Sequence, residues 1–397
     1  MHLMRVPSAG TWKTLIAAVG VALACLPVAI VGGSAVALGA PGGTIEYWGT
    51  LDGGVKQPFP VAVSLPGQIA QVGTSNSTQY ALLTDGTLWA WGVGTRGQLG
   101  DGGTQNSFTT AVQVQFPTGV RIASIPTDAD PFDTAYAVDT NGNVWGWGAN
   151  QGGELCLGNK KQSDTPVQLP LHGVTAVAGA ANHTSYDAAG TLYSCGENTY
   201  GELGDGKTKS TDVPVQVKGL SGQSVTALVA GFANTGALLF NGTYYEWGWD
   251  GQGQLGDGVT GSSSDVPLQV RLPGAVTQAA QGGNTISDDW TLVLLSNGDV
   301  YAWGDSGSYQ LGTGNRDTEA SPVQILPPGG VRYQTLAAGG QTSYAISTTG
   351  DVFAWGAGKF GQIGDGSTGP VKEPVLVESG ATLISSTSND VAVSVQG

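Results

Sequence analysis

Short apolar runs alternate with glycine-rich turns along most of the chain, in a pattern that returns about every fifty residues. Each copy has a Trp-Gly step, which lies seven residues before the apolar centre of a Gly-x-Leu-Gly turn. The steps are Trp91-Gly92, Trp147-Gly148, Cys195-Gly196, Trp247-Gly248, Trp303-Gly304 and Trp355-Gly356, and the centres are Leu99, Leu155, Leu203, Leu255, Leu311 and Ile363. Successive copies are 56, 48, 52, 56 and 52 residues apart. A fixed offset within a variable spacing predicts rigid units joined by variable loops, as in a propeller or an array.

The pattern within one copy predicts four β-strands. In the first copy these are expected at Ile69–Val72, Tyr80–Thr84, Thr87–Trp91 and Ala111–Val114, with a hairpin at Asp85-Gly86 between the second and third. A proline is expected to start the fourth strand in five copies, at Pro166, Pro214, Pro267, Pro322 and Pro374. Because proline lacks the N–H of the strand ladder, these strands are expected at the outer rim of each blade.

The two ends of the repeat region complement each other. Val391–Gly397 aligns with Tyr80–Gly86 and stops at the hairpin, whereas Gly43–Gly49 aligns with Gly86–Gly92 and begins there. The end segments are therefore expected to share one sheet. The sequence predicts an all-β fold, a seven-bladed β-propeller of four-stranded blades, in which strands from both termini close one blade and ring closure hides the sheet edges.

The N-terminus differs from the repeats. The run from Leu15 to Ala40 contains no charged residue, and Ala35-x-Ala37 fits a signal-peptidase site. We expect a signal peptide at residues 1–37 and a propeller at 38–397; the alternative is a membrane anchor retained at residues 15–40. With either, the repeats would be secreted or extracytoplasmic. The chain of 397 residues has a net charge of −15, and its 15 basic residues are spread along it, so nucleic acid is not expected as a partner.

Two cysteines would remain after cleavage of residues 1–37. Cys195 replaces the tryptophan of its Trp-Gly step, and Cys156 replaces the second glycine of its turn. In an oxidising compartment, an even number of cysteines favours a disulfide. The alternative is two separate buried thiols that fill gaps in the core.

The Trp-Gly steps and the Gly-Gln-Leu-Gly-Asp-Gly turns resemble the regulator of chromosome condensation repeat family, over residues 43–397. The resemblance implies a seven-bladed propeller, and the N-terminus suggests a bacterial-type, exported member. The family also implies a Gly-x-x-His-Ser/Thr step before the second strand, which only Gly179–Thr184 approaches here. The founding member exchanges nucleotide on a nuclear GTPase and docks on chromatin. The acidic charge and the missing histidines argue against transferring that activity.

Few residues suggest catalysis or metal binding. Asp101, Asp205, Asp257 and Asp365 recur one per blade, so they are expected to bond their own turns rather than to gather around a metal ion. His172 and His183 have no neighbours at zinc-ligand spacing, and His183 is expected to be structural. We therefore expect no cofactor, no metal and no enzyme activity. The alternative is an extracytoplasmic hydrolase or lyase that uses carboxylates at the central channel.

Strand parity predicts a binding face. The loops between the first and second strands and those between the third and fourth should emerge on one side of the propeller. Their exposed aromatic and charged residues are typical of protein interfaces. The candidate partner-binding residues are Arg96, Phe132, Tyr200, Phe232, Trp249, Asp250, Trp290, Tyr309 and Phe360. The sequence thus predicts a monomeric, non-enzymatic binding or scaffold protein whose ligand is a protein, with a cell-envelope glycan as the alternative.

Overall fold

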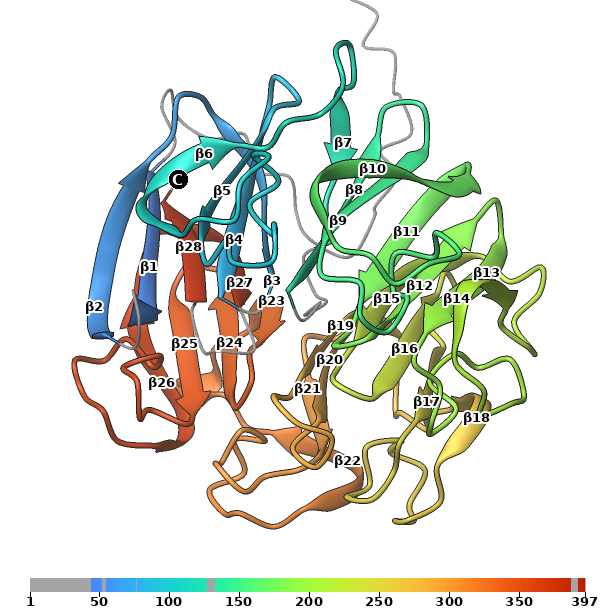
Figure 1. Cartoon of the computed structure of the whole chain (residues 1–397). Coiled ribbons are helices and arrows are strands. Elements are labelled where there is room, and N and C mark those ends of the chain that lie inside the picture. The colour runs from blue at the N-terminus through green and yellow to red at the C-terminus, as the bar shows by residue number, and fades with distance from the viewer. Residues whose placement is uncertain (1–43, 52–54, 76, 127–132, 387–391, 397) are drawn as a thin grey trace, which may run out of the picture.

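The computed structural model describes residues 44–51, 55–75, 77–126, 133–386 and 392–396. These residues form seven four-stranded antiparallel sheets arranged around a ring (Figure 1). The predicted signal segment and the alternative anchor lie outside the described residues. Within those ranges, no helix is long and apolar enough to cross a membrane.

Six sheets each use four strands that are consecutive in the chain, and the first strands of most neighbouring sheets contact one another. The first three of these sheets contain β3 (Ile69–Ser75), β4 (Thr78–Leu83), β5 (Leu88–Gly92) and β6 (Ser107–Gln113); β7 (Ile122–Ser124), β8 (Thr134–Asp139), β9 (Asn143–Gly148) and β10 (Ser163–His172); and β11 (Val174–Gly179), β12 (His183–Ala188), β13 (Thr191–Gly196) and β14 (Thr211–Gln216). The next three contain β15 (Val225–Ala230), β16 (Asn234–Leu239), β17 (Tyr244–Gly248) and β18 (Ser264–Gln269); β19 (Val276–Gly282), β20 (Trp290–Leu295), β21 (Val300–Gly304) and β22 (Glu319–Ile325); and β23 (Tyr333–Ala338), β24 (Thr342–Ser347), β25 (Val352–Gly356) and β26 (Val371–Glu378). A short 3₁₀ turn, η2 (Pro328–Gly330), precedes β23.

The seventh sheet joins the two ends of the chain. Its order is β2 (Val55–Ser64), β1 (Thr44–Leu51), β28 (Ala392–Gln396) and β27 (Ala381–Ser386). Ile45 of β1 lies opposite Val395 of β28 in an antiparallel pair, and Figure 1 shows the blue N-terminal strands beside the red C-terminal ones. The prediction of a blade closed by both termini is confirmed.

A buried tryptophan ties most blades to the blade before them. The indole Nε1 of Trp147 donates a hydrogen bond to the carbonyl of Gln98 at 2.8 Å, and Trp48 closes the ring by donating to the carbonyl of Gln362 at 2.8 Å. The same bond joins Trp247 to Glu202, Trp303 to Gln254 and Trp355 to Gln310. The second glycine of the turn makes room for the indole: a Cβ on Gly100 would lie 2.9 Å from Nε1 of Trp147. The turn glycine of one blade and the tryptophan of the next therefore recur together, because a side chain at the glycine would collide with the indole.

Two blades depart from this tryptophan bond. Trp91 follows the blade closed by both termini, which has no Gly-x-Leu-Gly turn, and its buried Nε1 has no hydrogen-bond partner in the described structure. Cys195 stands where a tryptophan would, and it forms a disulfide with Cys156 of the preceding turn, with the Cα atoms 5.6 Å apart. The alternative of two separate thiols does not hold. A covalent bond thus joins the two blades at the position where five other junctions have the indole hydrogen bond.

The prolines of the fourth strands lie inside the strands rather than at their start. Pro214 is the fourth residue of β14, and the pairing with β13 jumps from Ser194↔Val215 to Gly196↔Thr211 around it. The same irregularity surrounds Pro166, Pro267, Pro322 and Pro374. The expected strand start is therefore wrong by a few residues, because a bulge leaves the proline nitrogen without a ladder partner and lets the strand continue.

Candidate functional site

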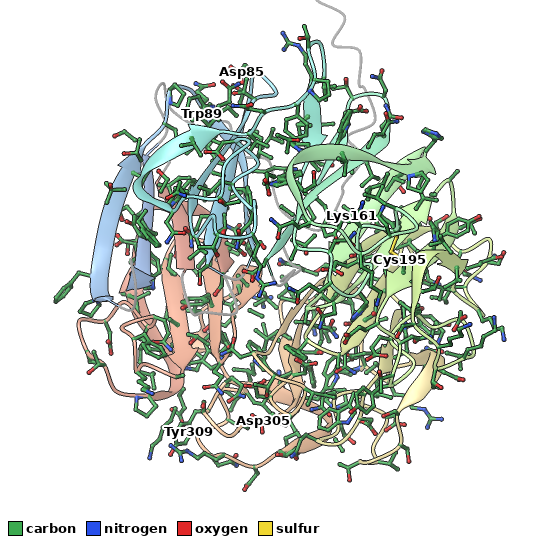
Figure 2. All side chains as sticks on the ribbon, in the orientation of Figure 1. Asp85, Trp89, Lys161, Cys195, Asp305 and Tyr309 are labelled. Carbon is green, nitrogen blue, oxygen red and sulfur yellow. A yellow bond between two sulfur atoms is a disulfide. The ribbon has the colours of Figure 1, made fainter. Side chains whose placement is uncertain are left out.

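The face predicted from strand parity exists as a hydrogen-bonded surface. The backbone N–H of Val93, which begins the loop after β5, donates to the carbonyl of Ser77 in the loop before β4 at 3.0 Å. Trp249 donates in the same way to Ala233, and Ala357 to Gln341. The loops between first and second strands and those between third and fourth strands therefore lie on one side of the ring. We call this side the loop face; the hairpins between second and third strands, such as that of Asp85, lie on the opposite side (Figure 2).

In three of the glycine-rich turns, a buried side chain fixes the backbone of the residue at the tip. In the first turn, the buried side chain of Gln98 accepts a hydrogen bond from the backbone N–H of Arg96 at 2.7 Å. The buried Glu202 and Gln362 hold the backbones of Tyr200 and Phe360 in the same way, each at 2.8 Å. Arg96, Tyr200 and Phe360 are therefore equivalent positions in three blades. Because their backbones are fixed, an interface at these side chains would lose little backbone entropy on binding.

Carboxylates join the loops of neighbouring blades. The Arg96 guanidinium forms an ion pair with Asp133 of the next blade at 3.2 Å, and its side chain remains 41% exposed. Asp289 accepts hydrogen bonds from the backbone N–H groups of Phe232 and Ala233 in the preceding blade, at 2.9 and 2.8 Å. Asp133 and Asp289 thus hold the loops of neighbouring blades together on the loop face.

Tyr309 has an unusual backbone on this face. It replaces the first glycine of its turn and keeps that glycine's conformation, with φ of 69°, close to 79° at Gly97 and 84° at Gly361. A side chain in this left-handed region costs roughly 1 kcal/mol or more. The ring is flanked by the Arg316 guanidinium, 4.6 Å from its centroid, and by the Lys372 ammonium of the next blade, 5.6 Å away (Tyr309 in Figure 2). Cation–π contacts offset part of the strain.

The structure separates the other predicted residues into two groups. Tyr200 is 36% exposed, and Phe232, Trp249, Tyr309 and Phe360 are partly exposed. Trp290 and Asp250 are only 1% and 0% exposed, so their expected display on the face is wrong. Phe132 lies outside the described residues.

The buried pair acts within the fold instead. Asp250 accepts a hydrogen bond from the N–H of Leu255 at 3.1 Å and so shapes its own turn, and burial raises its pKa to about 6. Trp290 begins β20, where its indole packs against Gly282. Loop position alone could not distinguish these inward side chains from outward ones.

The aspartates and the histidine that the sequence singles out have structural roles. Asp101, Asp205, Asp257 and Asp365 each accept a hydrogen bond from an N–H two residues further on, as expected. His183 is buried beside the Thr235 hydroxyl, 2.8 Å away, and burial lowers its pKa to about 3, so it is neutral. Within the described ranges, no group of three or more His, Cys, Asp or Glu side chains could hold a metal ion.

Glu246 is a buried acid that the sequence analysis missed. It lies in β17, where the equivalent residue is Ala90, Ala302 or Ala354 in other blades. Its carboxylate accepts hydrogen bonds from the Thr291 hydroxyl at 2.8 Å and from Trp303 Nε1 at 2.9 Å. Burial raises its pKa to about 8. An acid at a repeat position that is otherwise Ala, Gly, Ser or Tyr was the signal that could have revealed it.

The fold and its loop face define a closed seven-bladed propeller of tryptophan–glycine repeats. The chain belongs to the Regulator of chromosome condensation (RCC1) repeat family, whose repeat matches residues 85–126, 141–186, 189–238, 241–286, 297–346 and 349–392. Each matched repeat runs from the third strand of one blade into the inner strands of the next. The repeats therefore straddle the blades, which is why strands from both ends must combine in one sheet.

Two relatives illustrate the range of the family. The chain is 30% identical over 351 residues to the E3 ubiquitin-protein ligase HERC2 of Homo sapiens, over 84% of this chain and 7% of HERC2. It is also 30% identical over 300 residues to the Ultraviolet-B receptor UVR8 of Arabidopsis thaliana, over 74% of this chain and 66% of UVR8. The chain thus spans only a small part of HERC2.

Solved structures share the fold. Human WBSCR16 superposes with a TM-score of 0.77 at 20% identity, over 89% of this chain and 98% of that chain. Prp20p from Saccharomyces cerevisiae superposes with a TM-score of 0.75 at 20% identity, over 91% and 93%. At these identities the likeness concerns the fold.

Proposed function

We propose that this chain is an exported, non-enzymatic binding protein that recognises a protein partner through its loop face. Arg96, Tyr200, Phe232, Trp249, Tyr309 and Phe360 are the contact residues of this proposal. Export rests on the uncharged run from Leu15 to Ala40 and the Ala35-x-Ala37 site. The relatives reported above are human, plant and yeast proteins, so a bacterial source rests on the leader alone.

The observation that carries the proposal is the strained Tyr309. Five of the six turns have glycine at this position, which costs nothing in the left-handed region, yet here a tyrosine is held there between two cations. Backbone strain of this kind concentrates at sites where function maintains it. Tyrosine and arginine are also the residues that dominate binding energy at protein interfaces.

The relatives agree with protein binding. The yeast propeller Prp20p has been studied for its binding to Gsp1p and histones, and a structure of Kap60 bound to yeast RCC1 (Prp20) superposes on this chain with a TM-score of 0.75. UVR8 is named as a receptor. The engaged carboxylates of the loop face also favour binding over the alternative hydrolase or lyase, because Asp133 and Asp289 already accept hydrogen bonds from neighbouring loops.

Replacing Tyr309 with glycine separates binding from stability. The Tyr309→Gly variant is expected to melt at the parent temperature or above it, because the strain disappears, while its affinity for the partner falls at least tenfold. Trp249→Ala should also weaken binding at least tenfold. The measurement is quantitative capture from cell-envelope extract by the protein without residues 1–37, followed by titration of the captured protein.

Phe240 supplies the matched control on the opposite side. It lies at the Asn241-Gly242 hairpin and is 81% exposed, so Phe240→Ala removes an exposed aromatic ring from the face that is not proposed to bind. Its affinity should change less than twofold. Loss of binding in Phe240→Ala with full binding in Tyr309→Gly would show that the chosen face is wrong.

A further inference from the structure

Five of the 15 basic residues of the chain lie between residues 160 and 218, although the chain has a net charge of −15. They are Lys160, Lys161, Lys207, Lys209 and Lys218. Lys160 and Lys161 come from the loop between β9 and β10, and Lys207 and Lys209 from the equivalent loop between β13 and β14. The ring places the two loops side by side, so basic residues that are distant in the chain meet at one blade junction.

An open pocket of about 460 Å³ lies at the junction of the two blades, between these loops. Lys160, Lys207 and Lys209 line it together with Ser210, Thr211 and Asp212. An adjoining cavity of about 470 Å³ continues past Lys207 to Lys218. Together they form a groove lined by Lys160 and by residues between Lys207 and Lys218. We call it the lysine groove.

Buried side chains fix the backbone of the lysine groove. Asn150 donates from Nδ2 to the carbonyls of Asn159 and Lys161, at 2.9 and 3.0 Å. Asn198, at the equivalent position of the next blade, donates to the carbonyls of Lys207 and Lys209, at 3.0 and 3.3 Å. Both asparagines are fully buried. The lysines therefore extend from loops whose conformation is set within the fold.

Two further bonds hold the walls of the groove together. The N–H of Gly158 donates to the carbonyl of Asp212 across the blade junction, at 2.8 Å. The Cys156–Cys195 disulfide spans the same junction, and Figure 2 labels Cys195 together with Lys161. A preformed groove keeps its affinity because no loop must be ordered on binding.

We propose that the lysine groove binds an acidic polypeptide segment of the protein partner. This inference rests on the proposed function and names the chemistry of the segment that is recognised. The lysines supply point charges without the bidentate fork with which arginine grips phosphate. Asp205, paired with Lys207 at 3.6 Å, and Asp212 also line the groove, so its net positive charge is small and suits a segment with a few carboxylates rather than a densely charged nucleic acid.

The edge of β14 favours a polypeptide over a small anion. β14 is the last strand of its sheet, and Thr211, Asp212 and Val215 of this strand line the cavity. An extended peptide can lie against the side chains of this strand while its carboxylates reach the ammonium groups of Lys160 and Lys209. It does not extend the ladder, because Pro214 has no N–H and the Asp212 carbonyl already accepts from Gly158. Because the lysines are exposed, their attraction acts mainly on the association rate and depends on salt.

Binding of a fluorescein-labelled hexaglutamate peptide to the whole chain tests this inference. We expect saturable binding by fluorescence anisotropy at low ionic strength. The Lys160→Gln/Lys209→Gln variant should bind at least tenfold more weakly, with an unchanged melting temperature because both side chains are exposed. The Arg271→Gln/Lys359→Gln variant changes the net charge equally at distant blades, and its affinity should stay within twofold of the parent.

Several outcomes would overturn the inference. These are failure of the parent to bind hexaglutamate, an equal loss in both double variants, and tighter binding of inorganic phosphate or of a single-stranded DNA of six nucleotides. The proposed function is tested by a separate outcome. If Tyr309→Gly keeps its partner while the lysine variant loses hexaglutamate, the loop-face contacts are wrong and the lysine groove stands.

Discussion

A protein that begins at Gly53 is expected to lose its cooperative thermal transition or to melt at a much lower temperature. This truncation removes β1, which pairs with β28 on one side and β2 on the other. It also removes Trp48, whose indole donates to Gln362 and packs edge-on against Tyr344. Loss of a fully buried tryptophan alone costs about 3–5 kcal/mol. The opened ring would expose strand edges that promote aggregation.

A protein that begins at Gly43 is the control, because it keeps β1 entire. It should melt at the temperature of the parent in differential scanning calorimetry. A protein that begins at Gly53 and melts cooperatively at that same temperature would contradict closure of the ring by the two ends.

Glu246→Gln is expected to gain stability relative to the parent as pH rises between about 4.5 and 8. The folded-state pKa of Glu246 is raised to about 8 from 4.5 by burial, so the folded protein binds a proton that the unfolded chain releases. The contribution of Glu246 to the free energy of unfolding therefore falls as pH rises through this window, by about 1.4 kcal/mol per unit. Over the whole window this amounts to about 5 kcal/mol at most.

Burial favours the neutral form of Glu246, whereas the hydrogen bonds from its neighbours favour the carboxylate. Thr291 donates to Oε1 and Trp303 to Oε2, and the Gln281 amide also donates to Oε1. A glutamine at position 246 can accept from Thr291 and Gln281 at Oε1, and Trp303 keeps its hydrogen bond to the Gln254 carbonyl at 2.9 Å.

Urea unfolding of parent and variant from pH 5 to pH 9 measures this effect. Above pH 8 the Glu246→Gln variant should be more stable than the parent by several kcal/mol, and near pH 5 the two should differ little. Asp299→Asn, at a hairpin turn, should leave the slope of the parent unchanged. Parallel pH profiles for Glu246→Gln and the parent would show that the buried acid does not couple folding to proton binding.

The sequence could predict the propeller because every blade junction uses the same two motifs. The Trp-Gly step of one copy bonds the Gly-x-Leu-Gly turn of the copy before it, so both motifs recur along the chain. Cys156 and Cys195 replace both halves of one such contact, and the replacements come together because the disulfide needs both. The prolines were misplaced because a bulge depends on the partner strand, which a single segment does not reveal.

The site was predicted less completely because exposure depends on tertiary packing. Parity placed Trp290 and Tyr309 on the same side of the ring, but only the packed blades show that Trp290 lies inside while Tyr309 remains partly exposed. The lysine groove combines residues 160–161 with 207–218, and their proximity follows from the ring geometry. Glu246 was overlooked because an acid in an apolar strand forms no motif with its sequence neighbours.

Hydrogen–deuterium exchange of the propeller with and without its captured partner tests the use of the loop face most directly. The account predicts slower exchange on binding in the glycine-rich turns, at residues 196–206, 248–258, 304–314 and 356–366, with no change at the hairpins of 84–88, 240–243 and 296–300. Protection confined to those hairpins, with unchanged exchange in the turns, would contradict it.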